Sequence, residues 1–451
     1  MGSSLPAKLS FVASVAVLAF LLGFVTRWHG WFPNDHLEAA SAQATSLRKQ
    51  WTDVPLDLEA RVYDRSGART LDSSAVQPGL TLITSAWPTP DGDGLMPGAR
   101  LIDRAGRTVH AWRPDPAALF PSDDLRGGNP RTAFFHGAEL RPDGDLLLAL
   151  NYIGAVRLDA CGAVEWTRGD GIHHSITRAN DGSFWMGGVS AARRDTTARH
   201  PDGFPGLDGP VWMDRLLRVA PDGSVRADIN VLDVLYDNGL QRYVRKAYGP
   251  SSYTAENGDP THLNDVEALP AALADAYPGF EAGDLLVSLK HPNLIFVLDP
   301  ASRTVKWHAD SGPRDAHHLL QQHDPDFMGD GWIGVFDNRE DFTDRGTMLG
   351  GSRVLAFQPH TDSVRVLFPT PASDTIYTRN RGKWELLANG NRLLVESNAG
   401  RVLEVTPDGR TVWEWIHAPY DDARVPPVTG AYRTALTRAD VADWPCGPNG
   451  R

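Results

Sequence analysis

Histidines recur at matching places in this chain, and imidazole is the side chain in it best suited to chemistry. Near neutral pH it can act as a nucleophile, a general base or a general acid. One such histidine could instead tie neighbouring strands together by a hydrogen bond, but four at matched positions favour one shared site. They occur in the phrases Phe135-His136-Gly137, Ile172-His173-His174, Thr261-His262-Leu263-Asn264 and Gln322-His323-Asp324.

Arg339 adds an anion-binding group to this set. The stretch from His323 to Glu340 predicts a strand, a turn and a second strand. In such a hairpin Arg339 would lie near His323, and its planar guanidinium suits sulfate, phosphate or carboxylate. The alternative for Arg339 is a salt bridge to Glu340, Asp337 or Asp341.

The histidines belong to a repeated phrase that predicts the elements holding them. The copies at 136–166 and 389–413 share an Asp-Gly or Asn-Gly turn, an apolar strand, an Arg with an aliphatic residue, and a second turn. Each copy is typical of a β-meander, and meanders repeated around a ring form a β-propeller. The fold expected is an all-β, six-bladed propeller whose inner strands line a central shaft. Its units begin near Leu80, His136, His173, His262, His317 or His323, and Tyr377.

The composition and motifs of the chain argue against several classes of function. A net charge of −12 with a pI of 5.6 argues against a general nucleic-acid binder, because phosphate neutralisation needs a basic surface. No P-loop, dinucleotide fingerprint or Gly-x-Ser-x-Gly motif occurs, and no cofactor is expected. The two cysteines, Cys161 and Cys446, make no zinc site. They could pair with each other in an oxidising compartment.

The N-terminal region is apolar and uncharged from Leu9 to Thr26, and Trp28 and Trp31 follow. A helix of this length spans about 27 Å, which is close to the thickness of a bilayer core. We expect a membrane anchor over 1–33 with a transmembrane helix at 9–26, a stalk over 34–78, and a propeller with a C-terminal tail over 79–451. A cleaved signal peptide is less favoured, because the nearest Ala-x-Ala, at 40–42, is distant. The protein would be single-pass, with its globular domain on the periplasmic side.

Together these features resemble the bacterial arylsulfotransferase family. The resemblance is carried by the six-unit pattern, the histidines that open the units, the hairpin from His323 to Arg339, and the phrase at 389–405. It covers roughly Leu80 to Trp415. It implies a propeller outside the cytoplasm that moves a sulfuryl group between phenols, without a nucleotide sulfate donor or a metal, by way of a sulfated histidine.

The resemblance also implies partners and residue roles. The partners would be a phenolic sulfate donor, a phenol acceptor and the membrane, with a protein partner left open and no nucleic acid. His262, His323 and Arg339 match positions that bind the sulfuryl group or handle protons, and His174 is a weaker match. The residues expected to carry catalysis are His262, His323, Arg339 and His174, and those expected to contact substrate are Asn264, Asn338, His136 and Arg379.

The sixth unit departs from the pattern, because its strand at 376–380 has no histidine. His174, His262 or His323 would then serve as the nucleophile. One alternative is a non-catalytic, membrane-anchored propeller that binds an anionic ligand or scaffolds a protein complex. Another is a metalloenzyme, which is disfavoured because adjacent histidines in a strand point to opposite faces. Its ligands would come from His173, His174, His317, His318 and His323, with Asp265, Glu267 or Asp324.

Overall fold

The computed structural model describes residues 5–29, 58–89, 94–121, 130, 133–207, 209–247, 258–309 and 318–446. The chain divides into two compact units, Met1–Leu56 and Asp57–Arg451. In the first unit the described residues form α1 (Leu5–His29). No helix within the described ranges is both long and apolar enough to cross a membrane, so the transmembrane helix predicted at 9–26 is not supported. Residues 34–57 of the predicted stalk lie outside those ranges.

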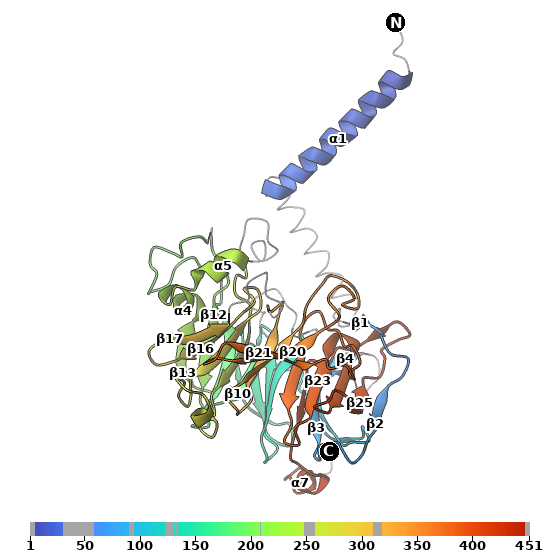
Figure 1. The fold of residues 1–451 in the computed structure, drawn as a ribbon, viewed down its shortest axis with the longest axis vertical. Helices are drawn as coiled ribbons and strands as arrows, with labels where there is room; N and C mark the ends of the chain where they lie inside the picture. Colours follow the sequence, from blue (N-terminus) through green and yellow to red (C-terminus); the bar gives the residue numbers. More distant parts are fainter. Residues whose placement is uncertain are drawn as a thin grey trace. The chain divides into compact units, whose positions relative to one another are not determined.

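The second unit is a six-bladed β-propeller, which confirms the predicted fold class. Its blades follow one another along the chain (Figure 1), and within each blade neighbouring strands pair antiparallel. Blades one to three are β27 (Gly430–Arg433) with β3 (Thr81–Pro88), β4 (Leu95–Ile102) and β5 (Thr108–Trp112); β6 (Phe135–Leu140), β7 (Leu146–Leu150), β8 (Gly154–Leu158) and β9 (Val164–Arg168); and β10 (His173–Arg178), β11 (Phe184–Val189), β12 (Asp214–Val219) and β13 (Val225–Asn230).

Blades four to six continue the pattern, and the last gains a fifth strand. They are β14 (Leu263–Ala268), β15 (Leu285–Leu289), β16 (Leu294–Asp299) and β17 (Thr304–Ala309); β18 (His323–Phe327), β19 (Ile333–Asp337), β20 (Arg353–Gln358) and β21 (Ser363–Phe368); and β22 (Lys383–Leu386), β23 (Arg392–Glu396), β24 (Arg401–Val405) and β25 (Thr411–Ile416) with β2 (Gly67–Thr70).

Short helices occupy the connections between strands. Side-chain caps begin three of them: Asp115 caps α3, Asn230 caps α4 and Thr437 caps α7, each accepting an N–H from the first turn. The helices are α3 (Pro116–Leu119), α4 (Val231–Asp237), α5 (Gln241–Ala247) and α7 (Arg438–Ala442), with 3₁₀ turns at η2 (Ala274–Ala276) and η3 (Ser397–Ala399).

The core lies between neighbouring blades. Strands near the shaft, such as β15, are buried along their whole length, whereas outer strands such as β9 are mostly exposed. Apolar side chains of adjacent sheets pack against each other, as Leu216 of blade three and Val287 of blade four do within one cluster. Burying these faces is the main force that holds the blades in a ring.

The ring is closed by segments from both ends of the second unit. The inner strand of blade one is β27, which pairs with β3 (Gly430 with Thr84). The segment beginning at Leu80 therefore supplies the second strand of that blade and not its first. The N-terminal strand β2 extends blade six by pairing with β25. A disulfide joins Cys161 to Cys446, with 5.1 Å between the Cα atoms, and ties the tail to blade two.

Candidate active site in the central shaft

The inner strands of four blades are irregular at the same place. Pairing with the second strand shifts register between Phe135 and Gly137, His173 and Ile176, Leu263 and Asp265, and His323 and Pro325. Such bulges re-aim side chains. The backbone φ is positive at His174 (59°) and His262 (48°), a conformation that costs a non-glycine residue about 1–3 kcal/mol. Strain that recurs in a ring around the shaft indicates a site built for its side chains.

These bulges bring the histidine rings together around His174. Its ring centroid lies 5.1 Å from that of His136, 5.4 Å from that of His262 and 6.4 Å from that of His323. The rings of His136, His174 and His323 line a small cavity of about 20 Å³, which we call the histidine chamber. The chamber is lined by His136, His174, Asn264, His323, Asp324, Arg381, Gly382, Lys383 and Thr429.

Hydrogen bonds fix the tautomer of His323. The amide nitrogen of Asn338 donates to the carbonyl oxygens of Thr378 and Arg381, both at 2.8 Å, so its Oδ1 is left to accept. His323 Nδ1 lies 2.7 Å from that Oδ1 and 3.0 Å from the Gln321 carbonyl oxygen, and therefore carries the proton. Nε2 of His323 then has a free lone pair. Burial, together with the charge of Lys290, lowers the pKa of His323 to about 3, so the ring is neutral at ordinary pH.

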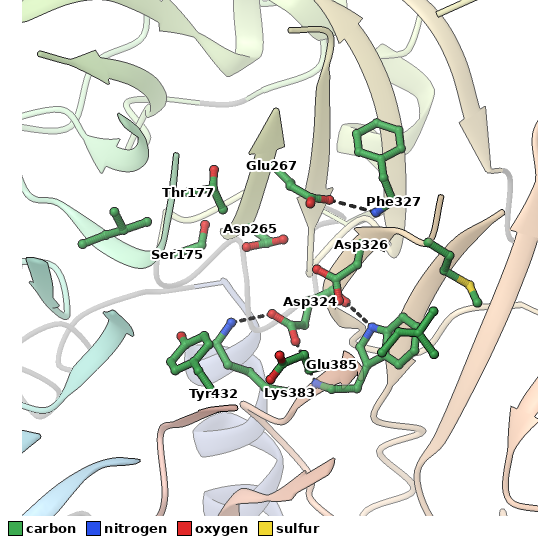
Figure 2. Close-up of a pocket in the computed structure, with 14 residues that line it drawn as sticks. Ser175, Thr177, Asp265, Glu267, Asp324, Asp326, Phe327, Lys383, Glu385 and Tyr432 are labelled. Carbon is green, nitrogen blue, oxygen red and sulfur yellow. Dashed lines mark hydrogen bonds and ion pairs between the residues drawn. The ribbon is translucent and has the colours of Figure 1, made fainter. Parts of the chain in front are cut away.

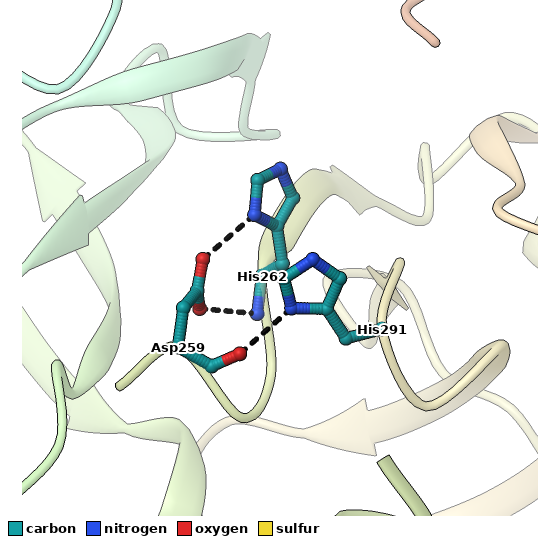
Figure 3. A group of neighbouring side chains, drawn as sticks. All are labelled: Asp259, His262 and His291. Carbon is teal, nitrogen blue, oxygen red and sulfur yellow. Dashed lines mark hydrogen bonds and ion pairs between the residues drawn. The ribbon is translucent and has the colours of Figure 1, made fainter. Parts of the chain in front are cut away.

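His262 has a carboxylate behind it. Asp259 Oδ2 lies 2.7 Å from His262 Nδ1, and Asp259 Oδ1 accepts the backbone N–H of His262 at 2.9 Å (Figure 3). Tyr152 Oη lies 3.3 Å from the same Nδ1. Burial lowers the pKa of His262 well below its usual value, although Asp259 opposes that shift. An imidazole backed by a carboxylate can take up a proton and hold it as an imidazolium.

Asp259, His262 and His291 also have the spacing of metal ligands, because their ligand atoms lie within 4.8 Å of one another. Hydrogen bonds account for this grouping. The Asp259 carbonyl oxygen lies 2.7 Å from His291 Nδ1, and the carboxylate is taken by His262. The arrangement is therefore explained as a device that orients two imidazoles.

Three cationic side chains lie near the imidazoles, and two of them also pair with carboxylates: Arg381 with Glu59 at 3.3 Å, and Lys383 with Asp324. Arg381 and Lys383 line the chamber, and the charges of Lys290 and Lys383 both lower the pKa of His323. Lys290 donates its backbone N–H to the His262 carbonyl oxygen at 3.0 Å, which fixes the base of its side chain beside that strand. Cations fixed in a buried site stabilise negative charge that develops on a bound oxyanion.

The family model for arylsulfotransferase (ASST) matches residues 141–418, which is more than half of the chain and includes the histidines at 173, 174, 262 and 323. The chain belongs to the arylsulfotransferase family. Membership carries with it sulfotransferase activity in general and phenolic substrates as a class.

Several solved structures are similar to this chain at low sequence identity. A Bacteroides caccae protein of unknown function is 10% identical with a TM-score of 0.46, over 78% of this chain and 99% of its own. A streptogramin B lyase is 12% identical with a TM-score of 0.39, over 78% and 87%. The Kuenenia stuttgartiensis hydrazine synthase is 12% identical with a TM-score of 0.38, over 72% and 76%. No curated protein matches the chain.

The structure brings six of the eight predicted site residues of this arylsulfotransferase together and leaves two arginines apart. Arg379 is exposed and pairs with Glu59 at 3.2 Å. Arg339 is half-buried near Arg353, and its backbone N–H donates to the Leu320 carbonyl oxygen at 3.0 Å, which holds the predicted hairpin beside the His323 loop. Neither guanidinium lines the histidine chamber. The residues brought together are His136, His174, His262, Asn264, His323 and Asn338.

Sequence reasoning missed the cations of the chamber and the carboxylate behind His262. Arg381, which lines the chamber, stands two positions after the predicted Arg379 in the same loop. Asp259 precedes His262 by three residues, a spacing too common in loops to be singled out. Lys290 follows β15 and reaches the shaft only because the strand ends beside the start of β14.

A second and larger cavity, of about 280 Å³, lies further along the same inner strands (Figure 2). Lys383 bonds Asp324 there, and Asp324 Oδ2 accepts the Trp384 N–H at 2.8 Å. Burial raises the pKa of Asp265 to about 7 and that of Glu267 to about 8. We call this the acidic cavity, and its charged lining residues are Asp265, Glu267, Asp324, Asp326, Lys383 and Glu385.

Proposed function

We propose that this arylsulfotransferase moves a sulfuryl group from an aryl sulfate to a phenol by way of a covalent adduct on His323. One observation carries the proposal: Asn338 holds the proton of His323 on Nδ1, which leaves an Nε2 lone pair in a chamber whose lining includes Arg381 and Lys383. A neutral imidazole with a fixed tautomer can attack sulfur directly. His323 is preferred to His262 because its side-chain partner is a neutral amide, and because the charges that lower its pKa are those of Lys290 and Lys383.

In the first half-reaction, Nε2 of His323 attacks the sulfur of the donor. The new N–S bond forms as the S–O bond to the aryl group breaks, and the electron pair leaves with the phenolate. Lys290, Arg381 and Lys383 stabilise the charge that grows on the sulfuryl oxygens.

In the second half-reaction, an acceptor phenol gives its proton to His262 and its oxygen attacks the sulfur. The N–S bond breaks and its electron pair returns to His323. Asp259 stabilises the imidazolium formed on His262, 2.7 Å away, and that proton later passes to the next departing phenolate or to solvent. Donor and acceptor thus use one site in turn, which is ping-pong kinetics.

We also propose that the propeller works outside the cytoplasm. The Cys161–Cys446 disulfide supports this location, because disulfides persist in oxidising compartments and are rare in the cytosol.

The test is the intact mass of the enzyme after a pulse of 4-nitrophenyl sulfate. An adduct of about 80 Da is expected on the wild type and on the control His360→Ala, whose histidine is exposed and remote from the shaft lining, but not on His323→Ala. An adduct that persists in His323→Ala places the nucleophile elsewhere. No adduct, and no 4-nitrophenol release with a panel of phenols, would favour a propeller that only binds its ligand.

A further inference from the structure

The histidine chamber is too small to hold the whole donor on which the proposed function depends. A volume of about 20 Å³ has room for about one water molecule, whereas pockets for small-molecule ligands measure about 300–1,000 Å³. The aryl group must therefore lie in a neighbouring space. The acidic cavity shares Asp324 and Lys383 with the chamber, but its carboxylates would repel a negatively charged sulfate ester.

A larger cavity lies next to Arg381, which lines the chamber. The guanidinium of Arg381 pairs with Glu59 at 3.3 Å, and Glu59 lines a cavity of about 700 Å³. Residues 58–62, which we call the strap, form part of the lining of this strap cavity. The aromatic rings of Phe342 and Tyr377 line it as well. The strap cavity therefore has the size and the aromatic surfaces that an aryl group needs.

The carboxylate of Glu59 occupies an anion site between the strap cavity and the chamber. Its Oε1 accepts the Asn398 amide N–H at 2.6 Å and lies 3.3 Å from Arg381 Nη1. Its Oε2 lies 3.2 Å from Arg379 Nη2. Two guanidinium groups and one amide thus converge on a single anion, and the same donors suit the oxygens of a sulfate ester.

Other contacts hold the strap in place. β1 (Glu59–Ala60) pairs with β26 (Arg424–Val425), and the Tyr63 hydroxyl donates to Glu396 at 2.6 Å. Neither contact uses the carboxylate that fills the anion site. The side chain of Arg379 is 57% exposed, and ion pairs with a solvent-exposed partner are weak. The carboxylate can therefore leave the anion site without detaching the strap.

We propose that Arg379, Arg381 and Asn398 form an entry site for the sulfate group of an aryl sulfate, and that Glu59 fills this site while the donor is absent. The sulfate group displaces the carboxylate, and the aryl ring lies in the strap cavity. Loss of the pair between Arg381 and Glu59 then opens the way to the chamber. This inference rests on the proposed function, because it supplies the route by which the donor reaches His323. Glu59 itself takes no part in the transfer.

The experiment measures the binding of 4-nitrobenzenesulfonate to the full chain by isothermal titration calorimetry. The sulfur of this probe is bonded to carbon and is not transferred, so binding is measured without turnover. We expect Glu59→Ala to bind the probe about tenfold more tightly than the wild type, because apparent affinity falls with the fraction of the protein whose site is free. Inorganic sulfate should bind more weakly than the probe to both proteins, because it leaves the strap cavity unused.

The matched control is Asp421→Asn, which removes a carboxylate that pairs with Arg424 of β26 at 2.6 Å and lines neither the chamber nor the strap cavity. It should bind the probe as the wild type does. Adding Arg381→Ala to Glu59→Ala should abolish the gain in affinity. If Glu59→Ala does not fold, Glu59→Gln replaces it and should also bind more tightly than the wild type.

Binding to Glu59→Ala that is equal to or weaker than binding to the wild type would overturn the proposal. Equal affinity for inorganic sulfate and the probe would also overturn it. These outcomes are distinct from failure of the proposed function. If no adduct forms on His323 but Glu59→Ala still binds the probe more tightly, the entry site stands without covalent transfer. If the adduct forms and the affinity does not rise, the nucleophile stands and the entry site does not.

Discussion

The histidine chamber and the acidic cavity are lined by successive parts of the same inner strands, but they differ in backbone geometry and in the charge of their side chains. At the chamber the strands bulge, His174 and His262 adopt positive φ, and partners fix the imidazoles as neutral bases. Beyond the bulge, pairing is regular, as between Glu267 and Leu286, and the side chains are carboxylates short of cations. The reactive imidazoles therefore lie where the backbone is irregular, whereas the regular parts of the strands carry the carboxylates that line the acidic cavity.

Loss of the nucleophile should separate the two regions most sharply. His323→Ala is expected to lower sulfuryl transfer at least a thousandfold, because no other group would carry the intermediate. Glu267→Gln should leave turnover within about twofold, since an amide replaces a carboxyl outside the chamber. The activity of both variants is measured by the release of 4-nitrophenol in the presence of an acceptor phenol. Equal losses of activity in the two variants would contradict the separate roles of the chamber and the acidic cavity.

Removing the carboxylate behind His262 should have the next largest effect. Asp259→Asn is expected to slow turnover about a hundredfold, as general acid–base groups commonly contribute that much. Adduct formation from 4-nitrophenyl sulfate should change far less, because its phenolate leaves without a proton. A loss that is the same for donors with good and poor leaving groups would argue against a proton-transfer role.

Removing the hydrogen bond that fixes the tautomer of His323 should slow adduct formation moderately. In Asn338→Ala the hydrogen bond of 2.7 Å to Nδ1 is lost, so part of the population places its proton on Nε2. We expect adduct formation about tenfold slower, with the folded state retained. Stopped-flow measurement of the 4-nitrophenolate burst, with circular dichroism as the folding control, tests this, and an unchanged burst would contradict it.

The smallest effect concerns stability against pH, where the two regions act with opposite sign. The folded pKa values of Asp265, about 7, and Glu267, about 8, exceed the ordinary value of about 4, so the folded state binds more protons and loses stability as pH rises toward 8. His323 has the opposite effect, because its folded pKa of about 3 lies below its ordinary value of about 6.5. The unfolded state therefore binds more protons, and the folded state loses stability, as pH falls below about 6.5.

Tm should therefore fall by a few degrees between pH 6.5 and 8, where His323 no longer titrates. The fall should flatten in the double variant Asp265→Asn, Glu267→Gln. A Tm that rises across this window in the wild type would contradict the raised pKa values.

The ring itself was predictable, because strand-and-turn periodicity and the matched histidines are local signals. The chamber followed from the topology, which brings matched positions on inner strands together. The origin of the first blade's inner strand was not predictable, because pairing of Gly430 with Thr84 is set by closure and not by neighbouring residues. Which arginine lines the chamber was not predictable either, because Arg379 and Arg381 lie in the same loop and both pair with Glu59.

The alternation of Asp265 with Glu267, and of Asp324 with Asp326, was visible in the sequence as a period of two. Strands that face solvent on one side show the same period. Only the position of these strands on the shaft turns an ordinary pattern into a buried cluster.

Closure of the ring by β27 has a consequence for synthesis on the ribosome. The blade containing β3 emerges early, but its inner strand is made only when residues 430–433 have been translated, and Thr429, which precedes them, lines the chamber. A nascent chain therefore cannot complete its first blade or close the ring until β27 has been made. Catalytic competence, and the shielding of the exposed edge from other chains, are acquired together once residues 430–433 have been translated.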